Sequence, residues 1–223
     1  SGRCTNEELY VFQKFMRMAV GTNHIDSSAR YGHVNGLHAM RLVQGTHRWT
    51  VTFDDILDAD VLILVGTNIT ETNPITGLKV KEAVKKRRAT LITIESLEPV
   101  VDTMSNIANL SHHHFRIPTS DTHHAIVGLV KAVLEQKLTQ PDLAQRHPTY
   151  FNAMTSALQQ ISWQELQAAT GIEPEAYVRA AKAAAGARRV VIVAGQLLLR
   201  SEQGYSGCLT LLDLLLLTGK LDE

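Results

Sequence analysis

The sequence predicts an α/β fold in which a mostly parallel sheet is covered by helices on both faces. Short, continuous apolar runs at residues 61–65, 91–94 and 190–193 are typical of strands buried on both sides. Segments with apolar residues at helical spacing separate these runs, and such alternation favours parallel strand pairing. The composition, 44% hydrophobic and 20% charged residues, agrees with a globular core. A chain of 223 residues fits one large domain, or one domain with a small lobe.

A capping box predicts the first helix. Thr5 and Glu8 have the spacing at which each side chain caps the backbone of the other, and apolar residues at helical spacing follow. Gly21 is expected to end this helix. A short extended piece and a turn then lead into a second helix at about residues 33–44.

The remaining elements are predicted from residues that typically begin or end helices and strands. Pro74 is placed for the first turn of a helix that runs to about residue 88. A weaker third strand is expected at about residues 112–117, with a helix N-cap at Ser120 or Asp121 after it. Further helices are expected at residues 122–136, within a helical segment at 140–188, and at about 205–218.

Composition and apolar patterning exclude several classes of partner. The 22 basic and 22 acidic residues balance, which gives no electrostatic reason to expect nucleic acid. The richest apolar stretch, residues 209–217, contains Asp213 and has about half of the roughly 18–20 residues that span a bilayer. We therefore expect no direct membrane insertion. The chain starts without methionine and stops directly after a predicted helix, which indicates an internal fragment.

Three predicted strands end in glycine or polar residues. Gly66 is followed by Thr67 and Asn68, the second strand closes on Glu95, and the last strand is followed by Gly195. Ligands of open parallel sheets bind at the carboxyl ends of strands, where glycine admits phosphate and an acid binds ribose hydroxyls. There is no Gly-x-Gly-x-x-Gly fingerprint, so an ordinary NAD site is not expected. The alternative is that these are ordinary turn residues.

Three consecutive histidines at residues 112–114 raise the question of a metal site. Alternate strand residues face opposite ways, so at most His112 and His114 could share an ion. No acidic residue or cysteine stands at ligand spacing, and the chain has just two cysteines. We predict no metal site.

Motifs in order along nearly the whole chain carry a resemblance to a known family. Residues 1–10 resemble the Thr-Asn-Glu-Glu helix of the molybdopterin oxidoreductase family. Residues 21–33 are similar to its Gly-Thr-Asn-Asn-x-Asp…Ala-Arg-x-Cys-His stretch, and residues 59–68 to its Ala-Asp-hydrophobic-Gly-x-Asn strand and loop. Residues 118–121 and 217–221 resemble its Pro-Gly-Thr-Asp turn and its Leu-Thr-Gly-Asn-hydrophobic close.

The resemblance implies a fold and a cofactor. Residues 31–223 would form a Rossmann-like lobe of the formate dehydrogenase and dimethyl sulfoxide reductase type, with the helical segment 140–188, and residues 1–30 a helix and linker from a neighbouring domain. The family binds molybdopterin guanine dinucleotide around molybdenum or tungsten. The residues that would surround one such dinucleotide are Gly66, Asn68, Glu95, Ser120, Asp121 and Gly195.

Departures from the family pattern argue against chemistry in this chain. Gly32 occupies the position of the cysteine, selenocysteine or serine that ligates the metal, and glycine has no donor atom. His33 is retained beside it. Glu95-Ser96-Leu97 replaces an Asp-Pro-Arg that could bind phosphate, and Thr119 replaces a glycine. We therefore expect no catalytic residue and no cofactor in this chain, while the resemblance keeps molybdopterin guanine dinucleotide as an alternative.

One branch of the family has this combination of features. The large iron–sulfur subunit of respiratory complex I, an NADH:quinone oxidoreductase, keeps the fold without molybdenum chemistry. The resemblance then implies a scaffold lobe in electron transfer from NADH toward quinone, with iron–sulfur clusters in an N-terminal part absent here. It also implies partner subunits in a membrane-associated respiratory complex, on its cytoplasmic side. The alternatives are a lobe of an active enzyme such as formate dehydrogenase, and a non-redox module that binds a nucleotide or protein.

Overall fold

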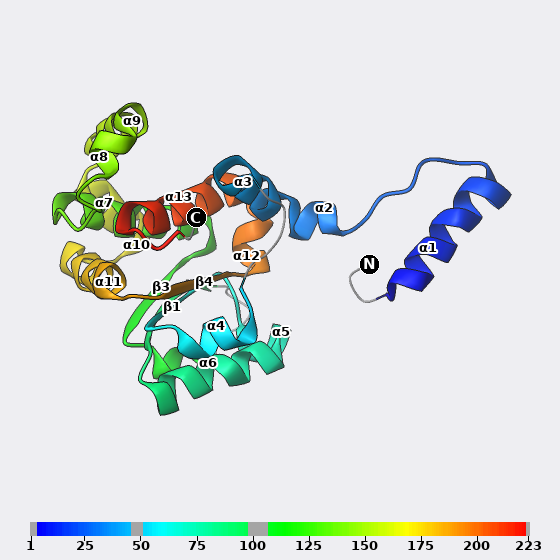
Figure 1. The fold of residues 1–223 in the computed structure, drawn as a ribbon, viewed down its shortest axis with the longest axis horizontal. Coiled ribbons are helices and arrows are strands. Elements are labelled where there is room, and N and C mark those ends of the chain that lie inside the picture. The colour runs from blue at the N-terminus through cyan, green and yellow to red at the C-terminus, as the bar shows by residue number, and fades with distance from the viewer. Residues whose placement is uncertain (1–3, 46–50, 98–106, 222–223) are drawn as a thin grey trace.

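The fold is taken from a computed structural model, which describes residues 4–45, 51–97 and 107–221 (Figure 1). Its core is a sheet of strands β1 (Val61–Val65), β2 (Thr90–Leu97), β3 (His113–Pro118) and β4 (Val190–Ala194). All pairings are parallel and the strand order is β3-β2-β1-β4. The predicted mostly parallel sheet is therefore confirmed. The chain builds the sheet outward from β1 to β3 and then returns to the other side of β1, so the strand order switches between β1 and β4.

Helices cover both faces of this sheet, as Figure 1 shows. Because side chains alternate along a strand, Ile63 and Val65 enter one core and Leu62 and Leu64 the other. The helices that contribute to the larger core include α3 (Val34–Gln44), α7 (Thr122–Glu135), α11 (Pro174–Gly186) and α13 (Gly204–Thr218). The smaller core lies under α4 (Phe53–Asp58) and α6 (Pro74–Arg87).

The predicted helical segment packs beside α7. It contains α8 (Leu143–Arg146), α9 (Pro148–Gln159) and α10 (Trp163–Thr170). Lys131 of α7 is buried, and its Nζ donates to the Leu158 carbonyl at 3.1 Å and pairs with Glu135 at 2.8 Å. The same ammonium lies 5.6 Å from the centre of the Trp163 ring. Lys131 thus fastens α9 to α7 through the Leu158 carbonyl and α10 to α7 through the face of Trp163, while Glu135 of α7 itself holds the ammonium group in place.

A second polar pair joins α9 to α13. The Tyr150 hydroxyl donates to the Asp213 carboxylate. Burial raises the pKa of Asp213, and the hydrogen bond from Tyr150 partly offsets that effect. Burial and the nearby carboxylate both raise the pKa of Tyr150. The pair explains how an otherwise apolar helix accommodates an acidic residue.

The N-terminal helix stands apart from the sheet body (Figure 1). Helix α1 (Asn6–Phe15) begins with the predicted capping box: Thr5 N donates to Glu8 Oε2 at 2.8 Å and Glu8 N to Thr5 Oγ1 at 3.2 Å. A π-helical turn (Met16–Val20) continues it, and Gly21 ends it with φ 74°. Within the described part of the chain, nothing buries a residue of α1.

Several short elements add to the predicted ones. They are α2 (Ala29–Gly32), α4, α5 (Ile69–Thr72), α12 (Gln196–Leu199) and the 3₁₀ turns Ala108–Leu110 and Thr119–Asp121. Asp121 is the N-cap of α7 as predicted, but its side chain makes no capping hydrogen bond. Among the described residues, no helix has both the length and the apolar character needed to cross a membrane.

Candidate functional site

A broad cavity of about 1380 Å³ lies at the carboxyl ends of β1 and β4. We call it the switch-point cavity because it opens where the strand order reverses, the place where open α/β sheets bind ligands. Of the predicted site residues, Gly32, His33, Gly66, Asn68 and Gly195 all line it. Segments that are far apart in the sequence therefore meet here, whereas Glu95, Ser120 and Asp121 are not among the residues that line the cavity.

Gly66 and Gly195 form the floor of the cavity and touch each other. Gly66 N donates to Ile94 O at 2.9 Å, and Gly195 N to Val65 O at 2.7 Å. A Cβ added to Gly195 would lie 2.3 Å from the Gly66 carbonyl oxygen. Gly66 itself has φ +60°, and its Cβ would lie 2.8 Å from Leu198 N. The close packing of the turns after β1 and β4 is thus sufficient to explain why both positions hold glycine.

Asn68 shapes the rim on the α5 side. Its carbonyl accepts from Glu71 N and Thr72 N, at 3.1 and 3.0 Å. Its side-chain Oδ1 accepts from Thr70 Oγ1 at 3.0 Å. Asn73 follows as the N-cap residue of α6, with no side-chain capping hydrogen bond, and lines the cavity. The rim therefore presents hydroxyl and amide groups together with one carboxylate, that of Glu71.

Gly32 lies in the opposite wall, at the end of α2. It is buried, and an added Cβ would meet Gln196 Nε2 at 3.9 Å, the closest atom that the structure describes around that point. That distance is ordinary van der Waals contact. Asn35 Nδ2 donates to Leu199 O at 2.7 Å and fixes this wall against α12. Neither packing nor backbone conformation demands a glycine at position 32.

Ser120 and Asp121 follow β3, whereas Glu95 lies within β2, because that strand runs to Leu97 and does not close on Glu95 as predicted. Glu95 is in register with Arg116 on β3. Ser120 Oγ donates to Asp121 Oδ2 at 2.8 Å, and Asp121 Oδ1 lies 3.0 Å from His124 Nδ1. Of the described residues that line the cavity, Thr119 is the nearest in the sequence to Ser120 and Asp121. Because the cavity lining does not include these three residues, their predicted contact with a dinucleotide stays a prediction.

Helix α4 forms a wall of the cavity that was not predicted from the sequence. Phe53 begins this helix and lines the cavity. The signal was present, because Thr52 and Asp55 form a second capping box directly before β1. A short helix that leads straight into a strand begins near that strand's carboxyl end. Arg200, which follows α12, also lines the cavity and was missed.

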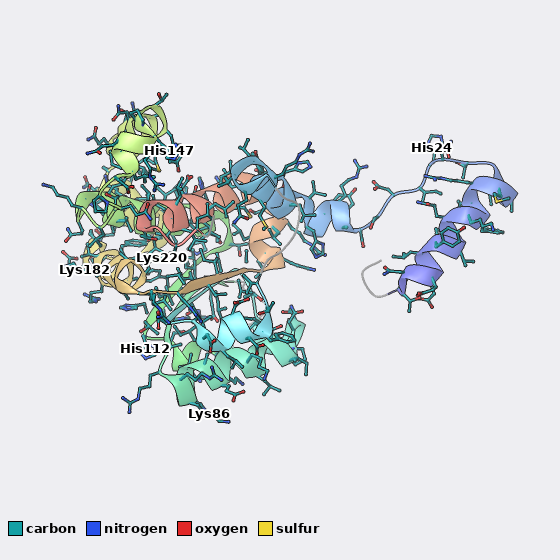
Figure 2. The ribbon with its side chains drawn as sticks, viewed as in Figure 1. His24, Lys86, His112, His147, Lys182 and Lys220 are labelled. Atoms are coloured by element: carbon teal, nitrogen blue, oxygen red, sulfur yellow. The ribbon has the colours of Figure 1, made fainter. Side chains whose placement is uncertain are left out.

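His112, directly before β3, and His114, within it, form hydrogen bonds with groups of the protein itself. His112 Nδ1 accepts from Leu91 N at 3.1 Å, and His114 Nδ1 lies 2.8 Å from Thr93 Oγ1. Figure 2 shows His112 on the same side of the sheet as Lys86, at the C-terminal end of α6. Among residues 4–45, 51–97 and 107–221, no group of three or more potential ligand side chains could hold a metal ion.

Comparison with known proteins yields a match over the whole chain. The family model for molybdopterin oxidoreductase matches residues 1–223. The F420-dependent formate dehydrogenase subunit alpha of Methanocaldococcus jannaschii is 24% identical over 223 residues, 100% of this chain and 32% of that protein. The NADPH-Fe(3+) oxidoreductase subunit alpha of Geobacter sulfurreducens is 31% identical over 200 residues, 90% of this chain and 23% of that protein.

A solved structure agrees with the fold. Acetylene hydratase from Pelobacter acetylenicus has a TM-score of 0.74 and 16% identity, over 95% of this chain and 28% of that one. The chain thus spans about a quarter to a third of the length of these proteins. Because the family model covers every residue, the chain belongs to the molybdopterin oxidoreductase family.

Proposed function

We propose that this chain is a dinucleotide-binding lobe in the large subunit of a multisubunit oxidoreductase, and that its switch-point cavity holds a molybdopterin guanine dinucleotide. The observation that carries the proposal is the meeting of Gly32, Gly66, Asn68 and Gly195 around one cavity. Residues 31–223 would be the lobe, and residues 1–30 would belong with a neighbouring domain. The exposed apolar residues of α1 support that division.

The residues of the cavity fit a dinucleotide. Its volume exceeds the roughly 300–1,000 Å³ usual for ligand pockets, and hydroxyl and amide groups from several elements line it. The first turn of α6 contains no acidic residue, and N–H groups of such a turn favour a phosphate. Arg200 adds a positive charge. Glu95, Ser120 and Asp121 would bind the part of the dinucleotide that extends over β2 and β3.

The metal is a separate question from the dinucleotide. When bound, molybdenum or tungsten supplies a redox centre that exchanges electrons with substrate and partner. Gly32 offers it no donor atom, so this chain would not complete its coordination. The names of the formate dehydrogenase and NADPH-Fe(3+) oxidoreductase relatives favour a redox enzyme of that type. Our first proposal is therefore that the chain belongs to a redox enzyme of this type.

Gly32 gives specific support to a second candidate, the scaffold lobe of a complex I large subunit. In that case electrons would pass from NADH toward quinone through iron–sulfur clusters elsewhere in the subunit, at the cytoplasmic face of a membrane. Relatives described as alpha subunits are compatible with partner subunits in either case. A non-redox nucleotide-binding module is the remaining alternative.

Metal and pterin content of the full-length protein from its native source tests the proposal. Molybdenum or tungsten with pterin, measured by elemental analysis and pterin fluorescence, is expected for the enzyme. Iron and sulfide without pterin would reject the cofactor site and support the scaffold. A bound nucleotide without pterin, iron or sulfide would support the binding module.

A further inference from the structure

Three large apolar side chains in the lining of the switch-point cavity are partly open to solvent. Val51 and Phe53 are each 48% exposed, and Leu197 is 38% exposed. All three line the cavity, Val51 and Phe53 before and within α4 and Leu197 within α12. Large apolar side chains that gather around a concave site mark a binding surface more often than scattered ones do.

Helix α4 fixes the backbone position of Phe53. Thr52 N donates to Asp55 Oδ2 at 2.7 Å, and Asp55 N donates to Thr52 Oγ1 at 3.3 Å. Hydrogen bonds from Thr52 lower the pKa of Asp55, so the cap persists at neutral pH. Behind the cap, Ile56 and Leu57 are 5% and 7% exposed and anchor the helix. A helix buried at these positions leaves the ring little backbone freedom, which lowers the entropic cost of binding against it.

The polar groups of the cavity lining determine which kind of ligand would fit it. Gly32 has no side chain, and the Gln196 carboxamide beside it offers both a donor and an acceptor. Thr67 and Asn73 add further hydrogen-bonding groups to the cavity lining. An apolar ring on one side with amides and hydroxyls around it suits a flat heterocycle that is polar at its edge, such as a guanine or a pterin.

We propose that Phe53 is the stacking platform for the planar heterocycle of the ligand in the switch-point cavity. The inference rests on the proposed function and adds to it a residue and a type of contact. Guanine and pterin share the required chemistry, since both are flat, aminated and rich in hydrogen-bonding groups. The experiment separates the two.

Tryptophan fluorescence tests the stacking directly. Phe53→Trp is titrated, in cofactor-free protein, with GDP and separately with neopterin. Phe12→Trp, at a similarly exposed position on α1 (56% exposed, against 48% for Phe53), is the matched control for absorption of light by the ligand. Quenching in Phe53→Trp beyond the control is expected, by GDP if guanine stacks there and by neopterin if the pterin does. Equal quenching of both variants by both ligands would overturn the proposal.

Affinity provides the second measurement. Equilibrium dialysis of the same ligand with Phe53→Ala should give binding weakened by about 5- to 150-fold, the effect of removing one aromatic stacking partner. Phe53→Leu keeps apolar bulk without a ring and should fall between Phe53→Ala and the unchanged protein. Pterin in the protein as purified, together with unchanged affinity in Phe53→Ala, would remove the stacking platform and leave the proposed function intact. Absence of pterin and of binding to the unchanged protein would reject both.

Discussion

The two ends of the sheet use polar residues in opposite ways. At the carboxyl end, β1 and β4 finish in glycines, and the hydroxyl and amide groups that follow line a cavity. At the amino end, Asp58 forms ion pairs with Arg87 and Arg189, the second at 3.3 Å. Asp60 Oδ2 accepts from the backbone N–H groups of Arg188 and Arg189, at 2.9 Å each.

This difference separates structural polar groups from functional ones. The amino-end carboxylates are engaged by the protein itself, so they fix where β1 and β4 begin. The carboxyl-end groups line a cavity, although Asn68 Oδ1 also accepts from Thr70, and the glycines there bring two turns into contact. We infer that the amino end contributes stability and the carboxyl end binding, which mutations at each end can test.

The largest effect is expected at the floor of the cavity. Gly195→Ala places a Cβ 2.3 Å from the Gly66 carbonyl oxygen, so β1 and β4 must separate where they end. We expect the free energy of unfolding to fall by about 3 kcal/mol, the upper range for overpacking. Urea unfolding followed by circular dichroism measures it. The control is Gly186→Ala at the end of α11, where a Cβ would have no described atom within 4 Å. A loss no greater than in the control would show that the floor is loosely packed.

A smaller effect is expected at the amino end. Asp60→Ala removes the acceptor of two backbone N–H groups, and we expect a loss of about 1 kcal/mol because water can replace the exposed carboxylate. Asp60→Asn retains an acceptor oxygen and should lose less. The same urea experiment measures both variants. The affinity for the ligand should not change in either variant. A weakened affinity would contradict the inference that the amino end contributes stability and not binding.

The sequence was sufficient to predict the framework because its signals are local. Buried strands appear as continuous apolar runs, and β1 was predicted with the bounds it has. The capping box of α1 was also visible in the sequence. The same reasoning joined Gly66, Asn68 and Gly195, because carboxyl ends of parallel strands share one edge.

What could not be predicted depends on packing between distant segments. The contact of Gly195 with Gly66 requires β4 to lie beside β1, and the sequence does not state strand order. Helix α4 was not predicted because six residues are too few to show a helical pattern of apolar residues. Its capping box, however, can be recognised in the sequence. Phe53 was missed with it. The open space beside Gly32 is a property of α2 and α12 together.

The smallest effect on stability is expected for Gly32→Cys, which tests chemistry rather than packing. The new Cβ would lie 3.9 Å from Gln196 Nε2, so we expect the free energy of unfolding to change by less than about 0.5 kcal/mol. Gly32 is buried but lines the cavity, so the introduced thiol should react with a thiol reagent faster than Cys208, which is packed in the core and whose pKa burial raises to about 11. We expect no formate or nitrate activity, because one donor atom does not restore the other departures from the family pattern. Gly32→Ala, which adds the carbon without the sulfur, is the control for packing. Formate oxidation by Gly32→Cys and not by Gly32→Ala would mean that the cavity already holds a competent metal centre, and the carboxyl end would then be catalytic rather than a binding site alone.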